Sequence, residues 1–208
     1  MTKYLRFMRH GATELNVADC WQGRADSPLT ELGRRQAAEA GAHMAEASIA
    51  PDHVYCSPKG RVVETLACAL PGVYARGAYE LEPGLVEIGF GSLDGKKHRA
   101  GEPQSPFRDS FVALGGESED EVEGRVCAAL ERIMLAEDAH DVLAVSHGTC
   151  GRIFRNRWAR LQRVEPPRHL ANCSLYTYEF DGQARTFSLV DIYEPALATN
   201  PEDFASAR

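Results

Sequence analysis

Residues 8–16, Met-Arg-His-Gly-Ala-Thr-Glu-Leu-Asn, follow a short and mostly apolar stretch at the start of the chain. That stretch, residues 4–8, predicts a buried strand with Arg9 and His10 at its end, where Gly11 lets the backbone turn. Imidazole nitrogen is a good nucleophile toward phosphorus, and a guanidinium holds phosphate oxygens in a fork. The stretch therefore offers a candidate nucleophile beside a candidate phosphate ligand. The alternative is a basic strand end with a solvated histidine.

The length and composition are those of an ordinary globular protein. With 208 residues, 44% apolar and 25% charged, we expect a single domain over residues 1–194 and a C-terminal tail over residues 195–208. The chain has no apolar run of membrane-spanning length and no signal-like N-terminus, so we expect a cytoplasmic protein with no membrane partner. The net charge of −7 argues against binding of nucleic acid, and an anionic substrate would need a local positive pocket.

The six cysteines are scattered without close pairs. In a reducing compartment such cysteines are small buried residues rather than a disulfide framework. None of them lies at the close spacing of a structural zinc site, so we expect no metal.

Apolar periodicity and turn signals predict alternating strands and helices. The expected strands are residues 4–8, 53–57, 79–81, 141–146, 174–180 and 186–192. The expected helices are residues 30–48 after an N-cap at Thr30, 58–69 with Pro58 in the first turn, a helix opened by a capping box at Ser118, and 150–161. Between them, residues 96–110 form a polar excursion that we interpret as a flexible lid or insertion.

This alternation predicts an α/β fold, a three-layer sandwich whose mostly parallel central sheet carries helices on both faces. In such sheets, ligands bind beyond the carboxyl ends of the strands. Arg9-His10, Cys56-Ser57 and Ser146-His147 all stand at expected strand ends. If these strands are parallel neighbours, their ends converge on one pocket.

Three further residues are candidates for that pocket. His147 repeats the pattern of His10, an apolar strand followed by histidine and glycine; the alternative is a histidine satisfied within the core. Arg61 lies one helical turn beyond Ser57 and can grip phosphate with its fork; the alternative is a solvated arginine. Glu87 lies among apolar residues and glycines, and burial of a carboxyl group favours its protonated form, so it is a candidate proton donor. The alternative is a glutamate at the edge of an irregular loop.

Two other chemistries fit less well. A cysteine phosphatase loop places five residues between its cysteine and its arginine, whereas only four separate Cys56 from Arg61, and Pro58 removes a needed amide. The six arginines over residues 152–168 are compatible with nucleic-acid contact, but the apolar residues among them form one helix face and leave the arginines solvated.

Taken together, these residues resemble the histidine phosphatase superfamily, of the cofactor-dependent phosphoglycerate mutase type. The matches run in family order to about Asn172: Arg9-His10-Gly11 with Thr13, Glu14 and Asn16; Gln22-Gly23 and Pro28 to Gly33; Ser57-Pro58 with Arg61 and Thr65; Glu87 with Phe90-Gly91; Gly116-Glu117-Ser118; and Ser146-His147-Gly148. Two departures are Leu93-Asp94-Gly95, where many members have a tryptophan-glutamate-glycine turn, and Lys59-Gly60, where small or apolar residues are usual.

The resemblance implies a phosphohistidine mechanism without metal or cofactor. His10 attacks phosphorus, while Arg9, Arg61 and His147 hold the phosphoryl oxygens. Glu87 protonates the departing oxygen and then takes a proton from water. The resemblance also implies substrate contacts at four positions: Asn16, Gln22, Gly23 and Gly148.

Residues 91–115 favour a phosphomonoesterase acting on a small phosphorylated metabolite. A mutase must shield its phosphohistidine from water and hold a second anionic group, which in the family falls to a longer, arginine-rich insertion at this place. Here the segment is short and has four basic residues, Lys96, Lys97, Arg99 and Arg108. A phosphoglycerate mutase is the first alternative, and a phosphate-binding protein without catalysis is the second. The identity of the ester and the oligomeric state stay open.

Overall fold

A computed structural model describes residues 2–98, 109–136 and 138–197. Its centre is a six-stranded sheet with the strand order β3-β2-β4-β1-β5-β6. The strands are β1 (Lys3–Arg9), β2 (His53–Cys56), β3 (Glu80–Leu81), β4 (Asp141–Ser146), β5 (Leu175–Asp181) and β6 (Thr186–Tyr193). The first four strands of this order pair in parallel, and β5 pairs antiparallel with both β1 and β6. The sheet is mostly parallel, as the sequence predicts.

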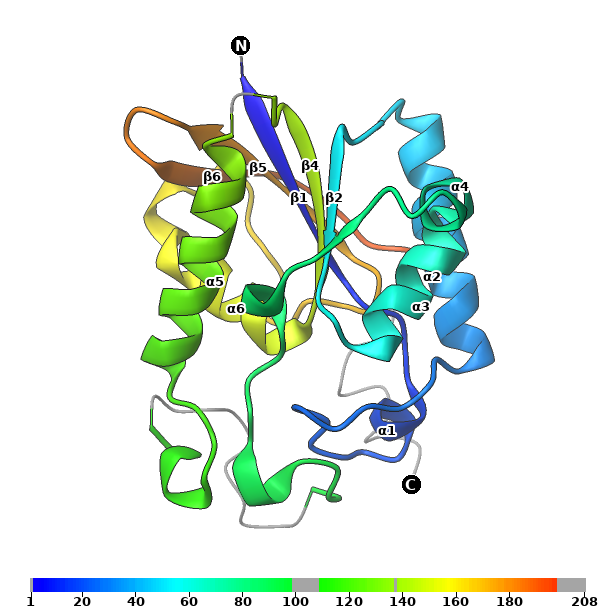
Figure 1. The fold of residues 1–208 in the computed structure, drawn as a ribbon, viewed down its shortest axis with the longest axis vertical. Helices are drawn as coiled ribbons and strands as arrows, with labels where there is room; N and C mark the ends of the chain where they lie inside the picture. Colours follow the sequence, from blue (N-terminus) through cyan, green and yellow to red (C-terminus); the bar gives the residue numbers. More distant parts are fainter. Residues whose placement is uncertain (1, 99–108, 137, 198–208) are drawn as a thin grey trace.

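Helices cover both faces of this sheet (Figure 1). One face carries α2 (Glu31–Glu46), α3 (Gly60–Ala69) and the short α4 (Pro71–Ala75); the other carries α5 (Glu119–Met134) and α6 (Gly148–Arg157). A single turn, α1 (Glu14–Val17), and four 3-10 turns at Pro83–Leu85, Gly91–Leu93, Val112–Leu114 and Ala159–Leu161 complete the described elements. The predicted α/β sandwich is confirmed, while α1 and α4 were not predicted.

The alternation of side chains along the strands divides the core into two layers. Phe7 and Ala144 face the layer with α5 and α6, whereas the neighbouring residues Met8 and Val145 face the layer with α2 and α3. All four are buried. Because successive strand residues point to opposite faces, a strand buried on both faces is mostly apolar. This explains the apolar residues 142–145 of β4 and the mostly apolar β1, in which Arg6 is only partly buried and pairs with Asp141.

Two helices begin elsewhere than the sequence indicates. The helix α3 starts at Gly60 rather than at Pro58, and the carboxylate of Asp26 accepts hydrogen bonds from its first amides. The helix α6 starts at Gly148 rather than at Cys150 and ends at Arg157, and Glu87 caps it in the same way. Both caps come from distant loops, so local sequence does not reveal them. The caps expected at Thr30 and Ser118 are confirmed, the latter as a capping box.

Two irregular segments can be assessed only in part. Of the expected lid, residues 99–108 lie outside the described residues, but the amide of His98 donates to the carbonyl of Asp19 and fixes the start of the segment. Of the expected tail, residues 198–208 lie outside the described residues. Residues 195–197 are instead hydrogen-bonded to α2, where the carboxylate of Glu39 accepts from the amides of Ala196 and Leu197.

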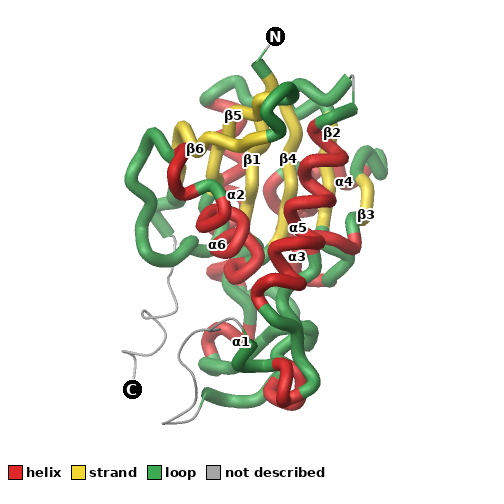
Figure 2. The backbone as a smooth tube through the Cα atoms, turned by 90° about the vertical axis from the view of Figure 1, so that its left-hand side faces the viewer, coloured by secondary structure: helices red, strands yellow, loops and turns green. Residues whose placement is uncertain are grey.

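The carboxyl ends of β1, β2 and β4 meet at one edge of the sheet. The β1–β4 register pairs Arg9 with Ser146, and the amide of Ser57, just after β2, donates to the carbonyl of Val145. Figure 2 shows α1 and the surrounding loops gathered below this edge. The predicted convergence of the three strand ends is therefore present.

Candidate active site

A cavity of about 220 Å³ opens at these strand ends. Eight of the nine residues that the sequence singles out line it: Arg9, His10, Asn16, Gln22, Gly23, Arg61, Glu87 and Gly148. The ninth, His147, is wholly buried behind this lining, with its ring centroid 5.3 Å from that of His10. Positions separated by more than 130 residues in the chain thus share one site.

His10 is held as a neutral imidazole with one nitrogen available. Its Nδ1 lies 2.8 Å from the carbonyl oxygen of Gly11. A carbonyl only accepts, so Nδ1 carries the proton and the lone pair is on Nε2. Burial, followed by the charges of Arg61 and Arg9, lowers the pKa of His10 well below its ordinary value. The ring is therefore neutral, with its one proton on Nδ1, and nucleophilic at Nε2 in the resting state.

The backbone around His10 is fixed on both sides. The amide of His10 donates to the carbonyl of Ser146, and its carbonyl accepts from the side chain of Asn172 at 2.9 Å. The next amide, of Gly11, donates to Thr65 Oγ1 at 3.0 Å, and Thr65 in turn donates to the carbonyl of Arg61. A rigid first residue after the strand gives the imidazole a defined position, as a nucleophile requires.

Arg9 presents a buried donor to the cavity. Its Nη1 donates to the carbonyl of Leu170, whereas Nε is buried and has no hydrogen-bond partner among the described residues. Burial lowers the pKa of Arg9 to about 10, and the guanidinium stays charged at neutral pH. A Cβ atom at Gly148 would lie 3.1 Å from this Nε, so the glycine leaves the space next to the donor open. An unpaired charged donor of this kind is a place for an anion.

Arg61 is arranged in a similar way, with only 1% of its surface exposed. Its Nη1 donates to Asp26 Oδ1 at 3.1 Å and to the carbonyl of Ala25, and its Nη2 donates to the carbonyl of Gly23 at 2.9 Å. Its Nε has no partner within the described part of the chain. The bidentate grip on phosphate that the sequence suggests is not available in this arrangement, because both Nη atoms are already bonded and only Nε is left.

His147 supports Arg61 from behind. Arg61 Nη2 lies 3.0 Å from His147 Nδ1; a guanidinium only donates, so Nδ1 accepts and the proton is on Nε2. That Nε2 lies 2.8 Å from Ser57 Oγ. Burial, with the charge of Arg61 next, lowers the pKa of His147 well below its ordinary value. The ring is thus neutral, and both of its nitrogens are engaged.

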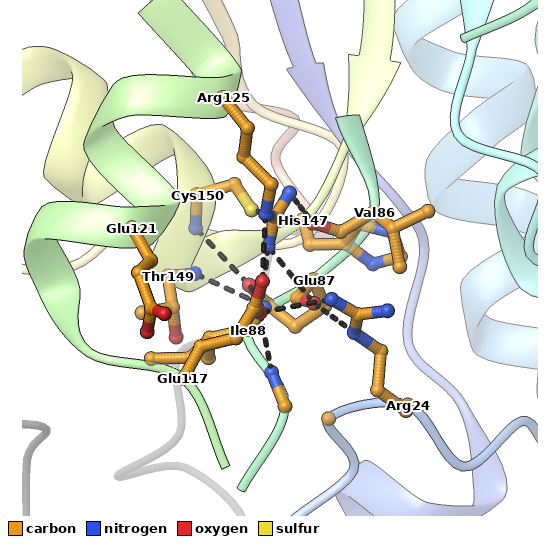
Figure 3. A network of polar contacts seen from close by, with 12 residues as sticks. Arg24, Val86, Glu87, Ile88, Glu117, Glu121, Arg125, His147, Thr149 and Cys150 are labelled. Atoms are coloured by element: carbon orange, nitrogen blue, oxygen red, sulfur yellow. Dashed lines mark hydrogen bonds and ion pairs between the residues drawn. The ribbon is translucent and has the colours of Figure 1, made fainter. Parts of the chain in front are cut away.

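Glu87 reaches the cavity from an irregular segment and is held by the start of α6 (Figure 3). Its carboxylate accepts from the amides of Thr149 and Cys150, each at 3.1 Å, and from the amide of Ile88 at 3.0 Å. Amides at a helix N-terminus favour negative charge. Three backbone amides therefore fix the position of the carboxyl group, a contact that the sequence does not indicate.

The loop between β1 and α2 supplies the other predicted contacts. Asn16 closes the capping box of α1 with Thr13, whose hydroxyl donates to the side-chain oxygen of Gln22 at 3.1 Å. Gly23 has a φ of +47°, and a Cβ atom there would lie 1.9 Å from an oxygen of Asp94. Only glycine fits this turn, and the turn brings the Gly23 carbonyl to Arg61.

Nine further lining residues were given no role in the site by the sequence analysis, although Phe90 stands in the Glu87 motif and Arg152 is one of the arginines expected to be solvated. They are Asp19, Cys20, Trp21, Phe90, His98, Thr149, Arg152, His169 and Leu170. Trp21 packs edge-on against Phe90, with centroids 4.9 Å apart, and lies 3.9 Å from the ring of His98. Glycines and neighbouring motif residues flank some of these positions, but none has a pattern of its own. Only the folded chain brings them to the cavity.

The site combines a neutral imidazole, a carboxylate and two guanidinium groups whose buried Nε atoms have no partner among the described residues. The described residues contain no group of three His, Cys, Asp or Glu side chains placed to hold a metal ion. No helix in the described ranges is long and apolar enough to cross a membrane. This geometry suits nucleophilic attack on a compact anion whose negative charge is met by the guanidinium groups.

Comparison with known proteins identifies the family. The family model for the histidine phosphatase superfamily (branch 1) matches residues 5–192. An acid phosphatase of Mycobacterium tuberculosis (strain ATCC 25618 / H37Rv) is 31% identical over 171 residues, which cover 79% of each chain. A probable phosphoglycerate mutase of Proteus mirabilis is 30% identical over 182 residues, which cover 83% of each chain.

A local match and a structural match complete the comparison. An ecdysteroid-phosphate phosphatase of Drosophila melanogaster is 45% identical over 74 residues, 35% of this chain but only 10% of that protein. The structure of YhfR from Bacillus stearothermophilus has a TM-score of 0.73 at 26% identity and covers 96% of this chain and 98% of its own. With a site of this geometry, a phosphoglycerate mutase-like fold and a family match over nearly its whole length, the chain belongs to the histidine phosphatase superfamily.

Proposed function

We propose that this chain is a metal-independent phosphomonoesterase that hydrolyses a small phosphorylated metabolite through a phosphohistidine at His10. A phosphatase of the histidine phosphatase family is the activity class that its relatives support. One observation carries the proposal for this chain: the free Nε2 of His10 shares a cavity with two buried guanidinium Nε donors that have no partner among the described residues. Those donors suit an anion.

In the first step, the lone pair of His10 Nε2 attacks phosphorus in line with the ester oxygen. A bond forms between Nε2 and phosphorus, and the bond from phosphorus to the ester oxygen breaks. Arg9 and Arg61 donate to the phosphoryl oxygens, whose charge is spread in a loose transition state. His147 holds Arg61 in place, and the protonated carboxyl of Glu87 gives its proton to the departing oxygen.

Glu87 delivers a proton in this step, and three amides hold its carboxyl group in position. Because the departing oxygen must receive that proton, we expect the highest activity at slightly acidic pH. His10 stays neutral there, because burial and the two arginines lower its pKa.

In the second step, water attacks the phosphohistidine. The carboxylate of Glu87 takes a proton from the water, the new oxygen–phosphorus bond forms, and the bond to Nε2 breaks. Inorganic phosphate leaves, and His10 returns to its neutral form with the proton still on Nδ1. Cationic side chains supply the charge that a metal ion supplies elsewhere.

The cavity supports a small leaving group. At about 220 Å³ it is smaller than the pockets of about 300–1,000 Å³ that hold drug-sized ligands. We propose Asn16, Gln22, Gly23 and Gly148 as substrate contacts because they line this space.

We also propose that the protein is cytoplasmic. Its six free cysteines, three of them buried, fit the reducing conditions of that compartment.

The test is release of phosphate from p-nitrophenyl phosphate at pH 5–7 by the intact chain and by His10→Ala. We expect turnover that survives EDTA and is lost in His10→Ala, with an acid-labile phosphoryl group on the intact protein after rapid quenching. If the intact chain turned over no faster than His10→Ala, the protein would be a phosphate-binding protein without catalysis. Turnover abolished by EDTA and restored by a metal ion would refute metal independence.

A phosphoglycerate mutase is the second candidate, because one relative that covers most of the chain is a probable phosphoglycerate mutase. Incubation with 3-phosphoglycerate separates the two activities. We expect phosphate release to exceed isomerisation. Sustained isomerisation at a rate above phosphate release would make the chain a mutase.

A further inference from the structure

We propose that Arg125 is a positioning residue for the proton donor: together with Glu117, it fixes the loop backbone that aims the Glu87 carboxyl group into the cavity. The inference rests on the proposed role of Glu87. Arg125 lies on α5, outside the lining of the cavity. Its effect on the reaction is therefore exerted through Glu87.

The guanidinium of Arg125 binds three backbone carbonyls within four residues. Its Nη1 donates to the carbonyls of Gly84, at 2.9 Å, and Val86, and its Nη2 donates to the carbonyl of Glu87 at 3.2 Å. Figure 3 shows Arg125 on the opposite side of this loop from Arg24, whose Nε donates to the same Glu87 carbonyl at 2.8 Å. Arg125 thus binds three of the four backbone carbonyls of residues 84–87.

Glu117 holds the segment that leaves Glu87. One of its oxygens accepts from Arg125 Nε at 3.0 Å, and the other accepts from the amide of Gly89 at 2.9 Å and from Arg125 Nη2 at 3.0 Å. Arg24 Nη2 lies 2.9 Å from the same oxygen. Burial acts to raise the pKa of Glu117, but the bonds from Arg125, Gly89 and Arg24 outweigh it and lower the pKa, so the carboxylate stays ionised.

The two sets of hydrogen bonds fix different parts of the segment around Glu87. The amides of α6 bind the carboxylate of Glu87, whereas on the α5 side Arg125 binds its backbone carbonyl and Glu117 binds the amide of Gly89, two residues further on. An irregular segment without a regular ladder of its own depends on such side-chain donors for its position. Lysine at position 125 cannot replace the arginine, because a single ammonium group does not reach three carbonyls and a carboxylate in one plane. Loss of the guanidinium should let the carboxyl group shift relative to His10.

The test uses the dependence of the reaction on the leaving group. Protonation by Glu87 matters for an alkyl phosphate, whose departing oxygen is strongly basic, and matters little for 2,4-dinitrophenyl phosphate, whose departing oxygen is stable as an anion. The quantity to measure is kcat/KM, which reports steps up to release of the alcohol and so excludes the attack by water. For Arg125→Met we expect a loss of about 100-fold on an alkyl phosphate and a much smaller loss on the dinitrophenyl ester.

Arg132→Met is the matched control. Arg132 lies on the same helix and pairs with Glu82, whose carboxylate also accepts from the amide of Gly84. Its side chain is 63% exposed, and the hydrogen bond it donates goes to Glu82 rather than to the carbonyls of Gly84, Val86 or Glu87. We expect its kcat/KM to equal that of the intact chain on both esters. Glu117→Gln is the second variant, which preserves size and removes the charge, and it should show the same leaving-group pattern. It decides the question if Arg125→Met does not fold.

Glu87→Gln separates this inference from the proposed function. If Glu87→Gln loses activity on the alkyl phosphate alone, while Arg125→Met and Glu117→Gln lose it equally on both esters or not at all, only the positioning role is refuted. If Glu87→Gln leaves both esters unaffected, Glu87 is not the proton donor, and both proposals fail. If the three variants share one leaving-group pattern, the positioning role is established.

Discussion

Replacing Gly148 with alanine should lower activity without unfolding the protein. Gly148 is the first residue of α6, and the added methyl carbon would lie 3.1 Å from Arg9 Nε and 3.4 Å from Arg9 Cζ. That Nε is a buried donor without a partner in the described residues, and we propose that it binds a phosphoryl oxygen. The methyl group crowds this donor and leaves every charge in the site unchanged.

The expected magnitudes follow from one lost hydrogen bond. A charge-assisted bond contributes about 1.5–3 kcal/mol, so its loss in the transition state lowers kcat/KM by about 10–150-fold. Stability should change little, because alanine stabilises a helix by about 0.5–1 kcal/mol relative to glycine and the close contact offsets part of that gain. Gly148→Ala is thus expected to be a folded and poorly active protein.

Gly124→Ala supplies the control for Gly148→Ala. Gly124 lies within α5, and a Cβ atom there would meet nothing within 4 Å. The assays are thermal unfolding, kcat/KM on p-nitrophenyl phosphate, and inhibition by inorganic phosphate. We expect Gly124→Ala to be fully active, and Gly148→Ala to lose both turnover and phosphate affinity. Full activity and unchanged phosphate inhibition in folded Gly148→Ala would refute the assignment of Arg9 Nε as a phosphate donor.

Three further predictions concern the same site. His10 and His147 have pKa values well below 6.5 in the folded state, so the unfolded chain binds more protons below pH 6.5. Their contribution to stability is complete above that pH and falls as the pH drops, by up to about 3 kcal/mol per pH unit for two imidazoles. Urea titrations at pH 5–7 should show that the free energy of unfolding changes less per pH unit in His10→Gln than in the intact chain. An identical change in both proteins would contradict this. Asp26→Asn removes a charge that caps α3 and pairs with Arg61, so it should cost about 1 kcal/mol in thermal unfolding and lower kcat/KM, whereas unchanged values would show that the pair is dispensable. Gly23→Ala would place a Cβ atom 1.9 Å from an Asp94 oxygen at a φ of +47°, so its melting temperature should fall, and an equally stable variant would show that the turn can relax.

The sequence determined the elements with strong local signals. The mostly apolar β1 and β4 could be recognised because strands buried on both faces carry few polar residues. The N-cap at Thr30 and the capping box at Ser118 were visible because their partners lie three residues away. The motifs at His10 and His147 were recognisable at strand ends, and those at Arg61 and Glu87 by their neighbours, in an order that resembles one family.

Only the tertiary structure decided how those residues are used. The starts of α3 and α6 depend on Asp26 and Glu87, which reach them from loops 34 and more than 60 residues away in the chain. The tautomers of the two histidines follow from which acceptor or donor each nitrogen meets. Local sequence carries no record of such partners, because a hydrogen bond between distant segments depends on how the whole chain packs.

Glu87, the proposed proton donor, illustrates this division most clearly. The sequence indicated a glutamate in apolar surroundings, from which burial alone would favour a neutral acid. The structure adds three amides on its carboxylate and the guanidinium of Arg125 on its backbone. The residue types of the site were thus written in the sequence, whereas their protonation and direction were set by contacts between segments that only folding brings together.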